Sequence, residues 1–175
     1  MPIFGGSKRP KLDGLTKEEE RRRDVLNPEV LRRSGEKGVA GQAPAALAIL
    51  HEKAEEEPGD FLWACLLGWQ YMSARRFSSA IEAFNEAIRR AGAEVRAYYG
   101  AGHAYFSAGE AKQNLGPATP SEAAPEDLTV DNLYQESLRC FRRGLDLAAD
   151  KGERDQIRSS IAAVEKMVAR KAGRL

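Results

Sequence analysis

An internal repeat with a period of 34 residues constrains the fold of this chain more than any other sequence feature. When the sequence is shifted by 34 positions onto itself, Gly68 aligns with Gly102 and Tyr71 aligns with Tyr105. Apolar residues recur at helical spacing around these positions, and no segment shows the sustained alternation that is typical of a strand. A fixed period of this size is typical of stacked helix pairs, which cannot bury their apolar faces singly. The sequence therefore predicts an all-α helical repeat array.

The segment 61–94 resembles the tetratricopeptide repeat (TPR). Seven residues lie at the offsets of that pattern: Leu67, Gly68, Tyr71, Phe77, Ala80, Phe84 and Ala87. Trp63 lies one position before the place where the pattern has its first bulky residue, and Ala64 occupies that place. The resemblance implies a right-handed superhelix of antiparallel helix pairs. In it, Gly68 and Ala80 allow close helix approach, and the large aromatic residues fill the space between helices.

The resemblance divides the chain into an extension, about three repeats over 27–151, and a cap. The expected parts are a basic, partly disordered N-terminal extension (1–26), a degenerate repeat (27–60), a matching repeat (61–94), a repeat with an insertion at 111–133 (95–151), and a capping helix with a basic tail (152–175). The insertion contains three prolines, so most of it is expected to be loop. It is interpreted either as a specialised partner contact or as a tolerated surface loop.

Local signals predict where several helices begin and end. Thr16 and Glu19 form a capping box, which predicts a short exposed helix over about 17–26 that Asn27-Pro28 interrupts. Three glycines in the run 34–41 predict that any helix there is short. A second capping signal, Thr129 or Asp131, follows the insertion and predicts a lengthened helix after it.

Composition and charge exclude several classes of protein. The 27 lysines and arginines nearly balance the 26 acidic residues, for a net charge of +1. A generic nucleic-acid binder is usually strongly basic, so no nucleic-acid partner is expected. No apolar run reaches the roughly 18 residues of a membrane span, and the first residues lack the apolar core of a signal peptide. The two cysteines, Cys65 and Cys140, are interpreted as free thiols, so we expect a cytoplasmic protein.

No combination of residues predicts an active site, a metal or a cofactor. His51 and His103 have no partner at zinc-ligand spacing, and no nucleophile–base signature can be assembled. The segment Gly100–Tyr105 begins like a dinucleotide-binding motif, but it has Tyr105 in place of the third glycine and lies in a predicted helix. The expected protein is not an enzyme.

The resemblance also implies a binding surface, because the first helix of each TPR-like pair lines a concave groove. The residues expected to face this groove are Leu62, Cys65, Trp69, Met72, Arg96, Tyr99, His103 and Phe106. Large aromatic residues, Met and Arg are enriched in binding hot spots. Cys65, Trp69 and Gly100 stand where some TPR grooves carry polar groups for a terminal carboxylate, which favours an apolar or amphipathic peptide or helix as the ligand.

These observations predict a protein-interaction module, an adaptor or scaffold with a protein or peptide partner. Two alternatives stay open: a small chaperone of a bacterial secretion system, and a homodimeric structural protein whose groove is self-occupied. The chain's own N-terminal segment could also fill the groove, through Ile3, Phe4, Leu12 or Leu15.

Overall fold

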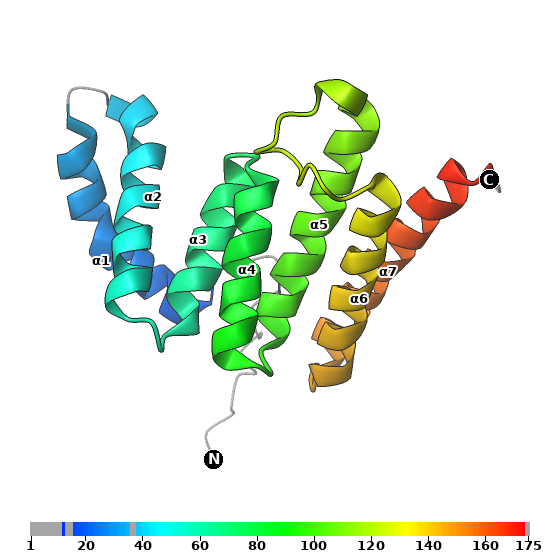
Figure 1. Cartoon of the computed structure of the whole chain (residues 1–175). Helices are drawn as coiled ribbons and strands as arrows, with labels where there is room; N and C mark the ends of the chain where they lie inside the picture. The colour runs from blue at the N-terminus through cyan, green and yellow to red at the C-terminus, as the bar shows by residue number, and fades with distance from the viewer. Residues whose placement is uncertain (1–11, 13–15, 36–37, 174–175) are drawn as a thin grey trace, which may run out of the picture.

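The computed structural model describes residue 12, residues 16–35 and residues 38–173. The described chain is all-helical, as expected, and contains no strand. Its elements are α1 (Lys17–Ser34), α2 (Gly38–Glu56), α3 (Phe61–Ser73), α4 (Phe77–Ala91), α5 (Val95–Leu115), the 3₁₀ turn η2 (Gly116–Ala118), α6 (Val130–Leu147) and α7 (Lys151–Lys171). Each helix packs against the next in the chain, so the helices stand side by side in sequence order (Figure 1). None of these helices is long and apolar enough to cross a membrane.

Side-chain caps fix the beginnings of several helices, among them α1 and α6. The Thr16 hydroxyl accepts a hydrogen bond from the Glu19 N–H, and the Glu19 carboxylate accepts one from the Thr16 N–H, which completes the predicted capping box. Thr129 caps α6, and its N–H donates in turn to Asn132. The C-terminus of α4 is closed by Gly92 at φ 65°, a backbone conformation that glycine adopts without strain.

The predicted interruption at Asn27-Pro28 is wrong, because α1 continues from Lys17 to Ser34 with Pro28 inside it. The expected boundary between residues 26 and 27 therefore falls within one helix. Proline removes a single backbone hydrogen bond, whereas Leu26 and Ser34 on either side of it are buried. The expectation of a short helix over 34–41 also fails, because α2 begins at Gly38 and runs to Glu56. In α1, the burial of Leu26 and Ser34 outweighs the local effect of the proline.

The insertion is shorter as a loop than its predicted range of 111–133. Helix α5 continues to Leu115 and α6 begins at Val130, which leaves residues 116–129 as the connection. This loop packs back on the helices: Ala124 is buried, and the Ser78 N–H donates to the Glu122 carbonyl at 3.1 Å. The Lys112 ammonium donates to three loop carbonyls, those of Pro125, Glu126 and Leu128.

The sequence repeat is also a repeat of contacts. A Cβ added to Gly68 in α3 would lie 2.8 Å from the ring of Phe84 in α4, and one added to Gly102 in α5 would lie 2.7 Å from the ring of Phe141 in α6. Both phenylalanine rings are buried, at 0 % and 1 % exposure. The two helix pairs α3–α4 and α5–α6 therefore pack through the same glycine–phenylalanine contact.

Candidate functional site

An open cleft lies between α1, α2 and α3. Its volume is about 550 Å³, which is within the range of pockets that bind ligands. Its apolar lining consists of Leu26 and Val30 from α1, Ala43, Ala46 and Leu50 from α2, and Leu66 and Trp69 from α3. Its polar lining consists of Arg23, Asn27, Gln42, Gln70 and Ser73. An apolar floor with a polar margin is the composition expected of a surface that takes an amphipathic segment.

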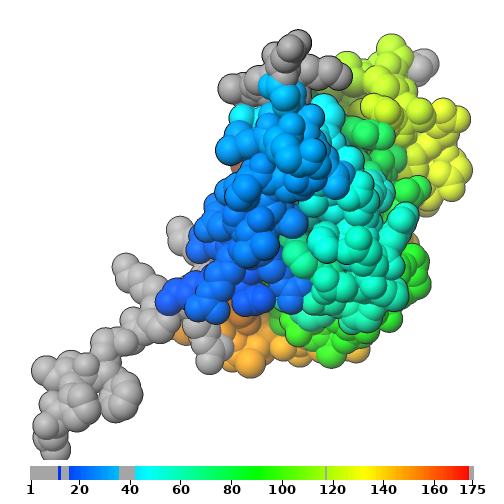
Figure 2. Space-filling model, turned by 90° about the vertical axis from the view of Figure 1, so that its left-hand side faces the viewer, coloured from blue at the N-terminus to red at the C-terminus, as the bar shows by residue number. Residues whose placement is uncertain are grey.

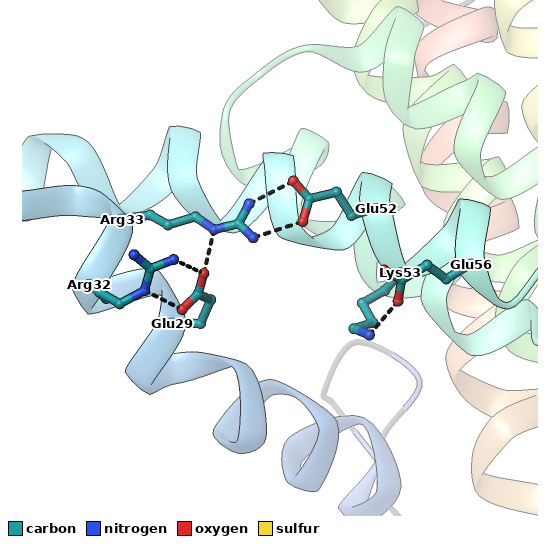
Figure 3. A network of polar contacts seen from close by, with 6 residues as sticks. All are labelled: Glu29, Arg32, Arg33, Glu52, Lys53 and Glu56. Atoms are coloured by element: carbon teal, nitrogen blue, oxygen red, sulfur yellow. Dashed lines mark hydrogen bonds and ion pairs between the residues drawn. The ribbon is translucent and has the colours of Figure 1, made fainter.

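A network of ion pairs joins the two helices that form one wall of the cleft. The Arg33 guanidinium of α1 donates to both carboxylate oxygens of Glu52 in α2, at 2.6 and 2.8 Å (Figure 3). Glu29 accepts hydrogen bonds from Arg32 and Arg33, and these bonds lower the pKa of its carboxyl to about 2. Figure 2 shows α1, in blue, lying on the surface beside the cyan α2. These solvent-exposed ion pairs join α1 to α2, and none of their residues lines the cleft.

Trp69 connects the cleft to the core. Its ring meets the Phe84 ring edge-on, with centroids 5.1 Å apart. The side chain remains half-buried and packs against two core clusters. Because the contact with Phe84 fixes the ring, Trp69 offers a rigid apolar face to the cleft at little entropic cost to a ligand.

Leu12, which precedes α1 in the chain, packs on helices of the second half of the molecule. Leu12 is 1 % exposed and packs in a cluster with Tyr99, Phe141 and Ile157. Its N–H donates to Oε1 of Gln156 in α7 at 2.9 Å. Leu12 is one of the four N-terminal residues that could fill a groove according to the sequence, and it is buried here. The other three, Ile3, Phe4 and Leu15, lie outside the described residues.

The first turns of α1 contact α5 and α3. Glu19 is 0 % exposed, and its Oε2 accepts a hydrogen bond from Nη2 of Arg96 at 2.7 Å. One turn later, the Arg22 guanidinium lies 4.7 Å from the centroid of the Trp63 ring and pairs with Asp60. The carboxylate that caps α1 therefore also binds a cation on α5.

The residues expected to face a groove have different surroundings. Cys65 and Tyr99 are buried, at 1 % and 3 % exposure. His103 lies against Tyr99, with ring centroids 4.5 Å apart, and Phe106 lies near Tyr134. Leu62, Met72 and Arg96 are partly buried. Trp69 is the member of this set that lines the open cleft.

The α1 wall of the cleft was not identified from the sequence. Leu26 and Val30 are spaced i, i+4 and are the signal that could have found it. Asn27-Pro28, between them, led to the prediction of a helix end. Because α1 is one continuous helix, Leu26 and Val30 lie on the same face and line the cleft together with residues of α2 and α3.

The described cysteines are buried, and their surroundings alter their acidity. Burial raises the pKa of both cysteine thiols, Cys65 and Cys140, to about 12. Such thiols are protonated at neutral pH and make poor nucleophiles. In the described part of the chain, no three His, Cys, Asp or Glu side chains are grouped so that they could hold a metal ion.

Comparison with known proteins does not assign a family. No family model matches the chain, and no curated protein is significantly similar to it.

Proposed function

We propose that this protein is a non-catalytic protein-interaction module whose α1–α2–α3 cleft binds an amphipathic helix of a protein partner. The observation that carries the proposal is the cleft itself, about 550 Å³ in volume, with apolar side chains from three helices and a half-buried tryptophan. Ligand pockets are typically concave and mostly apolar with a few polar groups, and the cleft has this composition.

The proposed architecture is a TPR-like array. Helix pairs α3–α4 and α5–α6 are its two regular repeats, α1–α2 is a degenerate first repeat, and α7 is the cap. The shared contacts of Gly68 with Phe84 and of Gly102 with Phe141 support this interpretation. In such an array the cleft lies on the concave side, which supports a helix or an extended peptide as its ligand. Two free, buried cysteines support a reducing compartment such as the cytoplasm.

The positive charge of Arg23, in the lining of the cleft, favours a partner that carries negative charge. Arg23 is the charged residue among those that line the cleft. Its side chain is 56 % exposed, and its guanidinium lies 3.8 Å from the exposed carboxylate of Asp24, a pair that solvent screens. A carboxylate on the polar face of a bound helix would pair with it, whereas a lysine would be repelled. The proposed ligand is therefore an acidic amphipathic helix.

The proposal is tested with two designed peptides and one pair of matched variants. An amphipathic Leu/Glu helix and its Leu/Lys counterpart are titrated against the full chain by fluorescence anisotropy. Ala46→Arg places a bulky charge inside the cleft, whereas Ala48→Arg places it on an exposed position of the same helix. We expect Ala46→Arg to weaken binding of the acidic peptide at least tenfold, Ala48→Arg to leave it unchanged, and Arg23→Glu to reverse the preference between peptides.

Equal binding by the Ala46→Arg and wild-type proteins would overturn the proposal. Sedimentation of the same variants tests whether a second copy of the chain occupies the cleft. A wild-type dimer that Ala46→Arg converts to a monomer would assign the cleft to a second copy of the chain instead of a partner.

A further inference from the structure

The contacts of Leu12 and Glu19 have the composition of a bound peptide. They combine an apolar side chain buried in a cluster of aromatic and aliphatic residues, a main-chain hydrogen bond to Gln156, and a charge-assisted hydrogen bond to Arg96. Interfaces with extended ligands use the same three elements: an anchor, backbone recognition and a fixed charge. The residues that receive these groups come from α5 and α7, far away in sequence.

The receiving surface is oriented by its own hydrogen bonds. The Gln156 amide donates through Nε2 to the Tyr99 hydroxyl at 3.1 Å, and this leaves Oε1 directed toward the Leu12 N–H. Tyr99 in turn lies against His103 and Phe141. A side-chain amide held in this way presents a defined acceptor to any peptide N–H that replaces that of Leu12.

The bond between Glu19 and Arg96 favours specificity more than stability. A buried ion pair repays its desolvation only in part. The second carboxylate oxygen of Glu19 is buried and has no hydrogen-bond partner in the part of the chain that the structure describes. A partner that brings its own carboxylate would replace Glu19 at Arg96, whereas the bond from the Thr16 N–H to Glu19 is local to the start of α1 and does not require Arg96.

We propose that the surface of α5 and α7 around Arg96, Tyr99 and Gln156 is a second docking site, and that the chain's own Leu12 and Glu19 occupy it until a partner displaces them. The partner segment has an apolar side chain followed, at the start of a helix, by a carboxylate. This site is separate from the α1–α2–α3 cleft and does not depend on the function proposed for the cleft.

The experiment uses the full chain and a peptide that copies residues 9–24. The variant Leu12→Asp/Glu19→Gln removes the internal occupant, and the peptide is titrated while the nuclear magnetic resonance signal of the Gln156 side-chain amide is followed. An intramolecular segment competes at an effective concentration on the order of millimolar. We therefore expect the peptide to bind the variant at least tenfold more tightly than it binds the wild-type chain. Adding Arg96→Met to the variant should abolish the peptide-induced change in the Gln156 amide signal. A peptide that itself carries Leu12→Asp and Glu19→Gln should also leave this signal unchanged.

Matched controls separate this site from the cleft. Gln70→Ala, a change in the cleft lining, should leave peptide binding by the Leu12→Asp/Glu19→Gln variant unchanged. Absence of a saturable shift in a variant that retains its helical circular dichroism would overturn the proposal. A wild-type dimer that Leu12→Asp dissociates would also overturn it, because the segment would then come from a second copy.

A single substitution provides a second test if the double variant does not fold. Glu19→Gln alone keeps the reciprocal capping bond, because glutamine serves in a capping box, but it loses the charge that faces Arg96. We expect trypsin cleavage after Lys17 to accelerate at least fivefold in this variant. An unchanged cleavage rate would contradict the role of the charge.

Discussion

Gly68 in α3 lies directly beneath the ring of Phe84 in α4, so that a Cβ at position 68 would come within 2.8 Å of the ring. Phe84 is fully buried and cannot move aside without displacing its neighbours. The missing side chain is therefore what allows α3 and α4 to approach each other. The same relationship between Gly102 and Phe141 joins α5 to α6.

Gly68→Ala should destabilise the protein by about 1–2 kcal/mol, although alanine is the better helix former, because overpacking outweighs the gain in propensity. The matched control is Gly144→Ala in α6, where an added Cβ would lie 3.5 Å from the nearest atom, an ordinary contact. That variant should gain roughly 0.5–1 kcal/mol. Urea unfolding measures both changes, and a stabilising Gly68→Ala would contradict the packing argument.

Lys112→Met should release the loop over residues 116–129. The ammonium group satisfies three carbonyls, those of Pro125, Glu126 and Leu128, and a thioether offers no donor to replace it. We expect cleavage by a glutamate-specific protease after Glu122 or Glu126 to accelerate by about five- to tenfold, which corresponds to roughly 1 kcal/mol of local stability. Lys112→Arg keeps donors in place and serves as the control; equal cleavage of all three proteins would show that the lysine does not hold the loop.

The two cysteines should resist thiol reagents at pH 8 in the folded protein. Burial raises the pKa of each thiol to about 12, so that the thiolate fraction is lower by about a thousandfold than that of a free cysteine. Absorbance after addition of a disulfide reagent follows the reaction, and unfolding in guanidinium should release both thiols at once. Rapid reaction of one thiol in the native protein would show that its surroundings open readily.

The ion pairs of Glu29 should make stability depend on acid pH. Hydrogen bonds from Arg32 and Arg33 depress the pKa of this carboxyl from 4.5 to about 2 in the folded protein. Because the folded pKa is the lower one, the stabilisation is complete above pH 4.5 and disappears as the pH falls toward 2. The difference in unfolding midpoint between wild-type and Glu29→Gln proteins should therefore shrink between pH 7 and pH 2.5. Glu55→Gln, at an exposed position in α2, is the control, and a pH-independent difference would contradict the linkage.

The sequence was sufficient for the parts of the fold that depend on local or periodic signals. The capping box of Thr16 joins residues three positions apart, and Thr129 was one of the two residues expected to cap the helix after the insertion. Gly68 and Phe84 lie at offsets typical of repeated helix pairs. Pro28 misled the prediction because its local effect opposes the burial of Leu26 and Ser34, which depends on a helix not yet placed.

The candidate site was harder to predict because its key contacts join distant segments. Glu19 belongs to a run of charged residues that resembles a solvated helix face, and nothing near it in sequence indicates a buried partner at Arg96, 77 positions away. Trp69 was identified as a groove residue from its place in the repeat. The cleft around it depends on α1, whose direction only the folded chain defines.

The hydrogen bond from Leu12 to Gln156 has a consequence for the way the molecule unfolds. The two residues are 144 positions apart, whereas the helices otherwise pack mainly on their neighbours in sequence. Stacks of that kind tend to lose their outermost helices first and independently. Here Leu12, which precedes the first helix, is bonded to the last helix, so that fraying of α7 would also release Leu12. While Leu12 is bound, the bond should couple the unfolding of α7 to the release of the residue that precedes α1.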